Sequence, residues 1–205
     1  MELLLIRHGL PTRVDHADGP ADPGLADLGH RQAEALAQWL VHERVNALYS
    51  SPLRRARETA APASRALGLD VVVDEELAEF DRGATFYVPV EDMRAENDPR
   101  LADLLAGRWG ADGNLDVTSF RATVVAAIER IVAGNAGGTV AVVAHGGVIN
   151  AYVADVLATP SVMVFEPGYT SVSRVLAARS GERNVVSLNE TAHLDRRSRN
   201  GRRTA

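Results

Sequence analysis

The chain has 205 residues, which is enough for one compact domain with a substantial buried core. Apolar residues make up 46% of the sequence and charged residues 24%, as in folded globular proteins, so a disordered chain is excluded. The net charge of -5 excludes an overall basic field that would attract nucleic acid, and no apolar stretch is long enough to cross a bilayer.

The sequence contains no cysteine, which excludes disulfide bonds and thiolate metal sites, and all 22 of its basic residues are arginine. The apolar run from Leu3 to Ile6 is too short for the core of a signal peptide, and it follows Glu2 where a signal peptide carries positive charge. We therefore expect a soluble, cytoplasmic protein that binds neither membranes nor nucleic acid. The sequence does not indicate the oligomeric state and is compatible with a homodimer.

Residues 1–194 have the composition of a single domain. The remaining segment, 195–205, is rich in arginine, and like charges at a chain end repel one another. We expect a basic, disordered tail there.

Apolar runs and turn residues predict alternating strands and helices. The predicted strands are Leu3–Ile6, Val45–Tyr49, Leu69–Val73 and Thr139–Ala144, and a hairpin joins Val172–Ala178 to Val185–Leu188. The first predicted helix is capped by Asp27. The second begins at Pro52 and ends before Gly68, and the third runs from Val90 to Leu105. The fourth extends from a cap at Ser119 to Gly134, and the fifth begins at Gly146. This order indicates an α/β three-layer sandwich, with a mainly parallel sheet and helices on both faces.

Two histidine motifs follow predicted strands. Arg7, His8 and Gly9 come directly after the first strand, and His145 follows the strand Thr139–Ala144. Ligands in such sheets bind beyond the carboxyl ends of the strands, so both imidazoles are expected at one edge. The glycines Gly146 and Gly147 would present the amides of a helix N-terminus to an anion.

A third motif, from Ser50 to Ala60, places arginines at a helix start just after a strand. A guanidinium group suits the tetrahedral oxygens of phosphate. A lone Arg-His pair is more often a surface or core feature than a catalyst, so the prediction rests on all three motifs together.

Together the motifs resemble those of the histidine phosphatase superfamily, also called the phosphoglycerate mutase-like family. They read Leu-x-Arg-His-Gly, Ser-x-Leu-x-Arg-Ala-x-x-Thr-Ala and Ala-His-Gly-Gly, and the resemblance extends along most of the chain. The segments Gly29–Ala33, Leu77–Gly83 and Asn189–Leu194 also resemble parts of that family.

The resemblance implies a phosphoglycerate mutase-like fold and a role for each motif residue. His8 would be the nucleophile, Arg7, Arg55 and His145 would bind the phosphoryl oxygens, and Glu79 would be the proton donor, with a pKa raised by burial. His145 would be protonated, because the site would have no metal ion and no other cofactor. The substrate-binding residues implied are Arg7, Gly9, Arg55, His145, Gly146 and Thr12.

Some residues have competing interpretations. Asp81 competes with Glu79 as the acid, although it is more often expected as a surface carboxylate or the partner of an arginine. Arg54 and Arg57 are expected on a solvated face of the helix. His16 with Asp15, Asp18 and Asp22 could form a metal-binding loop, but a solvated loop is the expected structure; His30, His42 and His193 are expected to be structural.

The sequence departs from the family pattern at Leu10, Pro11 and Val14, where polar residues are usual, and at Asn150, where arginine is frequent. We expect an apolar lip on the pocket and a lower affinity for phosphate unless Thr12 or Arg13 replaces the lost polar contact. We also expect weaker selection for highly charged substrates. Residues 74–114 have the weakest pattern and are expected to form a cap over the site.

The leading hypothesis is a phosphatase that hydrolyses a small organic phosphate ester through a phosphohistidine. The short insertion before His145 favours hydrolysis over phosphoryl transfer to a second substrate. A cofactor-dependent phosphoglycerate mutase is one alternative, and a phosphate-binding protein without catalysis is another. The natural substrate is not indicated.

Overall fold

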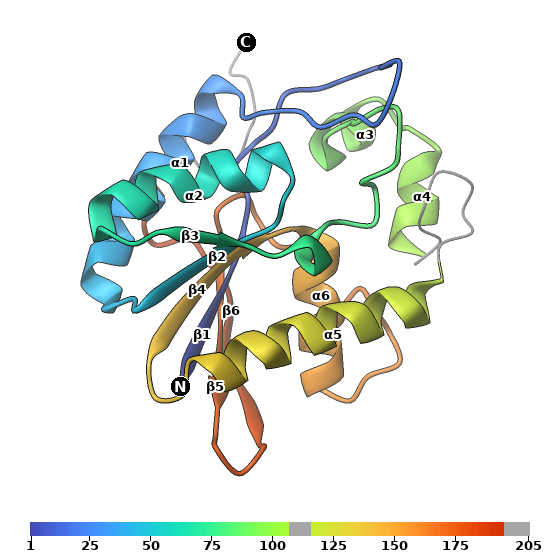
Figure 1. Cartoon of the computed structure of the whole chain (residues 1–205). Helices are drawn as coiled ribbons and strands as arrows, with labels where there is room; N and C mark the ends of the chain where they lie inside the picture. The colour runs from blue at the N-terminus through green and yellow to red at the C-terminus, as the bar shows by residue number, and fades with distance from the viewer. Residues whose placement is uncertain (107–115, 195–205) are drawn as a thin grey trace.

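The computed structural model of the protein describes residues 1–106 and 116–194, and its centre is a six-stranded sheet (Figure 1). The sheet has the order β3-β2-β4-β1-β5-β6. The parallel pairs are β1 with β4, β4 with β2, and β2 with β3. Strand β5 pairs antiparallel with β1, and β6 pairs antiparallel with β5. The prediction of a mainly parallel sheet is confirmed. The strands are β1 (Glu2–Arg7), β2 (Ala47–Ser50), β3 (Val71–Val73), β4 (Thr139–Ala144), β5 (Val172–Ala177) and β6 (Arg183–Glu190).

Helices cover both faces of the sheet, with α1 and α2 on one face and α5 and α6 on the other (Figure 1). This arrangement confirms the predicted sandwich. The helices are α1 (Asp27–Leu40), α2 (Arg54–Leu67), α3 (Val90–Ala95), α4 (Arg100–Leu105), α5 (Val117–Gly134) and α6 (Gly146–Val156), with 3-10 turns η1 (Val41–Glu43) and η2 (Glu75–Leu77).

The alternation of side chains along β1 divides the core into two layers. Leu3 and Leu5 pack in the layer of α5 and α6, whereas Leu4 and Ile6 pack in the layer of α1 and α2. All four side chains are fully buried. The continuous apolar run at the start of the sequence is therefore a strand covered on both faces, as parallel sheets require.

The single helix predicted from Val90 to Leu105 is wrong. The chain forms α3 and α4 instead, separated by Asn97, whose backbone adopts the left-handed conformation at φ 53°. Pro99 follows shortly afterwards, and the residue before a proline is disfavoured in helical conformation. These two local preferences end the first helix and start a second.

Some predicted helix starts are also displaced. The cap of α5 is Asp116 rather than Ser119, because the Asp116 carboxylate accepts hydrogen bonds from the backbone amides of Thr118 and Ser119. The helix predicted to begin at Pro52 begins at Arg54, since Leu53 is still extended. Asp27 is the first residue of α1 instead of its cap.

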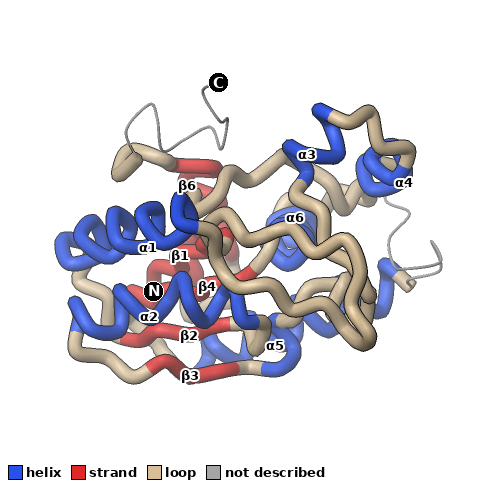
Figure 2. Tube along the Cα trace, turned by 90° about the horizontal axis from the view of Figure 1, so that it is seen from above, coloured by secondary structure: helices blue, strands red, loops and turns tan. Residues whose placement is uncertain are grey.

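The loop after β1 pairs with a segment more than sixty residues further along the chain (Figure 2). Val14 and Tyr87 exchange backbone hydrogen bonds of 2.9 and 2.7 Å, and the amide of Ala17 donates to the carbonyl of Thr85 at 2.8 Å. These segments and α3 lie at the end of the sheet where the parallel strands finish (Figure 1). The pairing fixes two irregular segments beside that edge.

No helix within residues 1–106 and 116–194 combines the length and apolar character needed to cross a membrane. The predicted tail at 195–205 and residues 107–114 of the predicted cap lie outside the described residues, as does residue 115.

Candidate active site

Three strands bring the motifs together at one edge of the sheet. The ends of β1 and β4 are in register, with Arg7 opposite Ala144, and β2 ends beside them. The amide of His8 donates to the carbonyl of Ala144 at 3.0 Å. His8, Ser51 and His145 are the residues that follow these strands, so parallel pairing alone places them side by side.

His8 is held in one orientation by its own turn. Its ring is buried, and Nδ1 lies 2.8 Å from the carbonyl oxygen of Gly9. Because a carbonyl can only accept, Nδ1 carries the ring proton and Nε2 keeps its lone pair. Burial, and then the charges of Arg55 and Arg7, lower the pKa of His8 well below its ordinary value. The ring is therefore a neutral imidazole with a free nucleophilic nitrogen.

The turn after His8 is fastened to α2 by one hydroxyl group. The amide of Gly9 donates to Oγ1 of Thr59 at 2.9 Å, and Thr59 Oγ1 donates to the carbonyl of Arg55 at 2.7 Å. A Cβ atom on Gly9 would lie 2.7 Å from the carbonyl oxygen of Gly29, so only glycine fits. This packing fixes His8 relative to the helix that carries Arg55.

His145 faces His8 across the edge, with ring centroids 5.1 Å apart. Its Nε2 lies 2.7 Å from the hydroxyl of Ser51. The expectation that His145 is protonated is wrong for this arrangement, because burial and the charges of Arg55, His8 and Arg7 lower its pKa well below the ordinary value. The imidazole is neutral here.

Each of the two site arginines is anchored at one side of its guanidinium group. Nη1 of Arg7 donates to the carbonyl of Pro167 at 2.6 Å, and its guanidinium carbon lies 4.1 Å from the ring centroid of Tyr169. Nη2 of Arg55 donates to Asp81 at 2.8 Å, and its guanidinium carbon lies 4.6 Å from the ring centroid of Tyr87. Both arginines are buried, with exposed fractions of 7% and 1%.

The other sides of these groups carry donors without partners. Among the described residues, no hydrogen-bond acceptor meets Nε of Arg7, Nε or Nη1 of Arg55, or Nδ1 of His145, and all four atoms are buried. Burying such groups unpaired is costly, so native proteins rarely do it without a functional reason. The four nitrogens suit an anion with several acceptor oxygens.

Glu79 is the second residue after the 3-10 turn η2, and its side chain reaches the same edge of the sheet. Its carboxylate accepts hydrogen bonds from the amide of Gly147 at 2.8 Å and from that of Phe80 at 3.1 Å. Burial, and then the nearby Asp81, raise the pKa of Glu79 to about 7, against the opposing effects of the two amides and Arg55. The predicted upward shift of the Glu79 pKa by burial is confirmed.

Asp81, the competing acid, is the partner of Arg55. Its side chain is 23% exposed, whereas Glu79 is buried. A carboxylate that pairs with a guanidinium group fixes the orientation of that group. Asp81 is therefore placed to direct Arg55, whereas Glu79 is the buried carboxyl that accepts from Gly147, two residues after His145.

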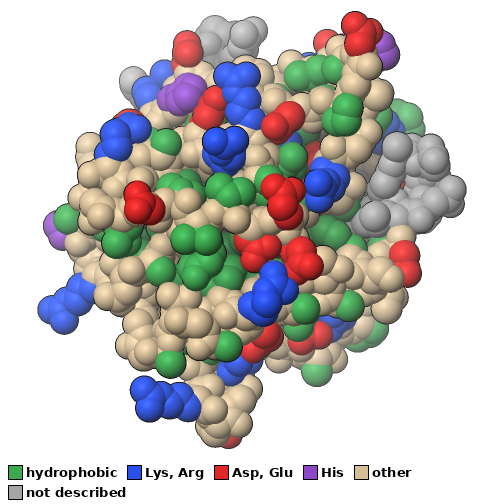
Figure 3. Space-filling model, in the orientation of Figure 1, with side chains coloured by type: hydrophobic (Ala, Val, Ile, Leu, Met, Phe, Trp, Pro, Cys, Tyr) green, Lys and Arg blue, Asp and Glu red, His purple; other side chains and the backbone are tan. Residues whose placement is uncertain are grey.

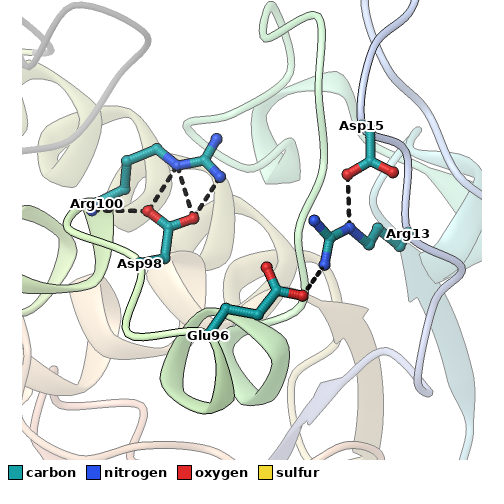
Figure 4. Close-up of polar contacts among 5 residues, drawn as sticks. All are labelled: Arg13, Asp15, Glu96, Asp98 and Arg100. Atoms are coloured by element: carbon teal, nitrogen blue, oxygen red, sulfur yellow. Dashed lines mark hydrogen bonds and ion pairs between the residues drawn. The ribbon is translucent and has the colours of Figure 1, made fainter.

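The remaining residues predicted at the site are Thr12, Arg13 and Gly146. Thr12 is exposed, and its hydroxyl donates to the carbonyl of Gly24 at 3.3 Å. The guanidinium group of Arg13 is engaged by the carboxylates of Asp15 and Glu96 (Figure 4). Gly146 begins α6.

Asn150 is a structural residue of this region. Its amide nitrogen donates to the carbonyls of Gly146 and Phe165, and its amide oxygen accepts from the backbone amides of Val164 and Phe165. It thus fastens the loop that precedes β5 to the first turn of α6.

Arg54 and Asp22, which have competing interpretations in the sequence, contact each other, and Arg54 also contacts Glu58. Arg54 pairs with Glu58 at 2.6 Å and is largely exposed, as expected for a solvated helix face. Asp22 accepts a hydrogen bond from the amide of Arg54. Across residues 1–106 and 116–194, no three His, Asp or Glu side chains gather in a way that could hold a metal ion.

Sequence reasoning missed four side chains that shape the site. Ser51 and Thr59 lie inside the arginine motif, but their hydroxyls were assigned no partner. Tyr87 and Tyr169 come from irregular segments, and no pattern in the sequence predicts that their rings lie against Arg55 and Arg7. A buried arginine needs support for its guanidinium face, which is the only signal that could have suggested them.

Comparison with known proteins identifies relatives of the whole fold. The structure of a mycobacterial glucosyl-3-phosphoglycerate phosphatase in complex with VO3 superimposes with a TM-score of 0.76 and 27% identity, covering 93% of this chain and 99% of that one. Phosphoserine phosphatase 1 of Hydrogenobacter thermophilus is 28% identical over 206 residues, which are 95% of this chain and 94% of the relative.

A bifunctional protein of Mycobacterium tuberculosis is 39% identical over 152 residues, which are 70% of this chain. The match spans only 40% of the length of that relative. A model of the histidine phosphatase superfamily, branch 1, matches residues 3–191. This match covers nearly the whole chain, and the protein belongs to the histidine phosphatase superfamily, branch 1.

Proposed function

We propose that the protein is a phosphatase that hydrolyses small organic phosphate monoesters through a phosphohistidine at His8. The observation that carries this proposal is the set of four buried, unpartnered nitrogens of Arg7, Arg55 and His145 beside the neutral ring of His8. Membership of the histidine phosphatase superfamily and the phosphatase names of two relatives support it.

The first step forms the bond between Nε2 of His8 and phosphorus and breaks the bond between phosphorus and the alcohol oxygen. Because its pKa is about 7, Glu79 is partly protonated at neutral pH, and the protonated form gives its proton to the departing oxygen. In the second step water attacks the phosphorus, Glu79 takes a proton from that water, and the bond to Nε2 breaks. Phosphate leaves, and His8 and Glu79 return to their initial forms.

Arg7, Arg55 and His145 stabilise the charge on the transferring phosphoryl group. Their free nitrogens are fixed before the substrate arrives, so little reorganisation is needed during reaction. His145 donates through Nδ1 while neutral, because Ser51 can donate to Nε2. Gly9 permits the close turn that holds His8, and Gly146 begins α6 directly after His145.

We further propose that the reaction needs no metal ion. Two buried guanidinium groups supply positive charge where a bound cation would otherwise act. The assay is hydrolysis of an aryl phosphate in excess chelator, by the wild type and by His8→Ala, with His30→Ala as the control because the His30 side chain is 55% exposed.

Wild type and His30→Ala should remain active in chelator, and His8→Ala should lose activity. Loss of wild-type activity in chelator would contradict the metal-free reaction. Activity that survives His8→Ala would contradict the nucleophile. Production of 2-phosphoglycerate from 3-phosphoglycerate in the presence of bisphosphoglycerate would show a mutase instead.

A further inference from the structure

Acidic side chains lie close to the proposed phosphate site. Asp81 contacts Arg55, and Glu91 accepts a hydrogen bond of 2.9 Å from the hydroxyl of Tyr169. The Tyr169 ring centroid is 5.9 Å from that of His8, so one tyrosine neighbours both the nucleophile and Glu91. The electrostatic influence of Glu91 also reaches Arg7. An incoming alcohol group therefore meets carboxylates beside the phosphate site.

The arginines of the irregular segments 11–25 and 74–105 are paired with acids. Within the described parts of segments 11–25 and 74–105, every arginine takes part in an ion pair, and the sequence contains no lysine. Figure 4 shows Arg13 with Asp15 and Glu96, and Arg100 with Asp98. The other two pairs are Arg82 with Glu75 and Arg94 with Glu166. Over the face seen in Figure 3, acidic and basic side chains are likewise interspersed.

A second anionic group on the substrate would gain little from such a surface. To bind Arg13 or Arg94 it would have to displace a carboxylate that already occupies the guanidinium group, which exchanges one ion pair for another. It would also lie near Asp81 and Glu91, where like charges repel in a partly desolvated site. Arg7 and Arg55 are committed to the phosphoryl group.

We infer that the alcohol part of the substrate carries no carboxylate and no second phosphate, so that the site takes phosphate monoesters of neutral or cationic alcohols. This inference rests on the proposed phosphatase function. It narrows the substrate class by charge: the phosphoryl group is the one anionic part that the described residues are arranged to receive.

Matched substrate pairs test the inference directly. Glycerol 3-phosphate differs from 3-phosphoglycerate, and O-phosphoethanolamine from O-phosphoserine, by a carboxylate. We expect kcat/KM to be higher for the member without the carboxylate in both pairs, by about tenfold or more for a repulsion between nearby partly buried charges. An equal or higher kcat/KM for the two carboxylates would overturn the inference.

Glu91→Gln tests whether the acidic surroundings cause the preference. The amide oxygen of glutamine can still accept from Tyr169, so the change removes charge with little change of shape. The ratio within each pair should fall severalfold. Glu34→Gln is the control, because Glu34 is an exposed partner of Arg65 between α1 and α2, and it should leave the ratio unchanged. An unchanged ratio in Glu91→Gln would contradict the role of Glu91.

An aryl phosphate assayed in parallel distinguishes failure of the proposed phosphatase function from failure of the inference about charge. If no substrate is hydrolysed, aryl phosphate included, the proposed phosphatase function fails. If aryl phosphate is hydrolysed and the carboxylate members are preferred, only the inference about charge fails.

Discussion

The hydroxyl of Ser51 lies 2.7 Å from Nε2 of His145 and accepts a hydrogen bond of 3.3 Å from the amide of Leu53. A hydroxyl has one proton to give, and with Leu53 occupying a lone pair it is free to donate that proton to the ring. Nδ1 of the neutral imidazole then carries the ring proton. His145 can thus donate to an anion without being charged.

Replacing Ser51 should therefore weaken phosphoryl transfer. Ser51→Ala leaves a buried ring nitrogen without its partner, which costs about 1–3 kcal/mol and should lower kcat roughly 5- to 150-fold. Ser51→Thr keeps the hydroxyl and should keep most of the activity. The tautomer is measured from 15N chemical shifts of His145, which should report protonation at Nδ1 in the wild type. Protonation at Nε2 instead would contradict this arrangement.

Glu79 should make the stability of the fold depend on pH. Its pKa is about 7 in the fold and 4.5 ordinarily, so between these values the unfolded chain releases a proton that the folded chain keeps. The contribution is thus favourable at low pH and is lost as pH rises from 4.5 to 7, by about 3 kcal/mol in total.

The Glu79→Gln side chain cannot ionise. Its free energy of unfolding, measured in urea, should therefore rise relative to that of the wild type by about 3 kcal/mol between about pH 4 and about pH 8. A difference that does not vary with pH would contradict the raised pKa of Glu79.

Asp81 should control the pH at which the acid step fails. Hydrolysis of an alkyl phosphate needs protonated Glu79, so kcat/KM should fall above about pH 7 in the wild type. Asp81→Asn removes a negative charge that raises the Glu79 pKa, so the fall should begin at lower pH. Asp155→Asn, which alters an exposed pair with Arg121, is the control. A fall that keeps its position in Asp81→Asn would argue against this coupling.

Gly29 should be required for the turn that holds His8. A Cβ atom there would lie 2.1 Å from the carbonyl oxygen of Leu10, so Gly29→Ala must displace the turn. We expect a loss of about 1–3 kcal/mol in unfolding free energy, and lower kcat. Gly134→Ala places a Cβ in open space at the end of α5 and should not destabilise the protein. Equal effects of the two substitutions would contradict the packing explanation.

Much of the fold was predictable because its strands are short apolar runs that end at polar motifs. The bounds of β4 agree with the prediction, and Gly68 ends α2 in the left-handed conformation expected of a helix terminus. The gathering of His8 and His145 also followed from the sequence, since neighbouring parallel strands finish at one edge. These features depend on local pattern and sheet geometry.

The remaining features depend on contacts between distant segments. The backbone pairing of Val14 with Tyr87 has no side-chain signature in the sequence. The break between α3 and α4 comes from Asn97, whose left-handed backbone is permitted but not required by its residue type. The charge of His145 was mispredicted because it depends on the burial of the ring and on Arg55 and Arg7, which only the folded chain provides.

The most direct measurement is the location of the phosphoryl group during turnover. The protein is mixed with an aryl phosphate, quenched in alkali because phosphohistidine is hydrolysed in acid, digested and analysed by mass spectrometry, with His8→Ala beside it. We predict one phosphoryl group on the peptide that contains His8, and none in His8→Ala. A phosphoryl group on another residue, or steady turnover with no phosphorylated peptide, would contradict it.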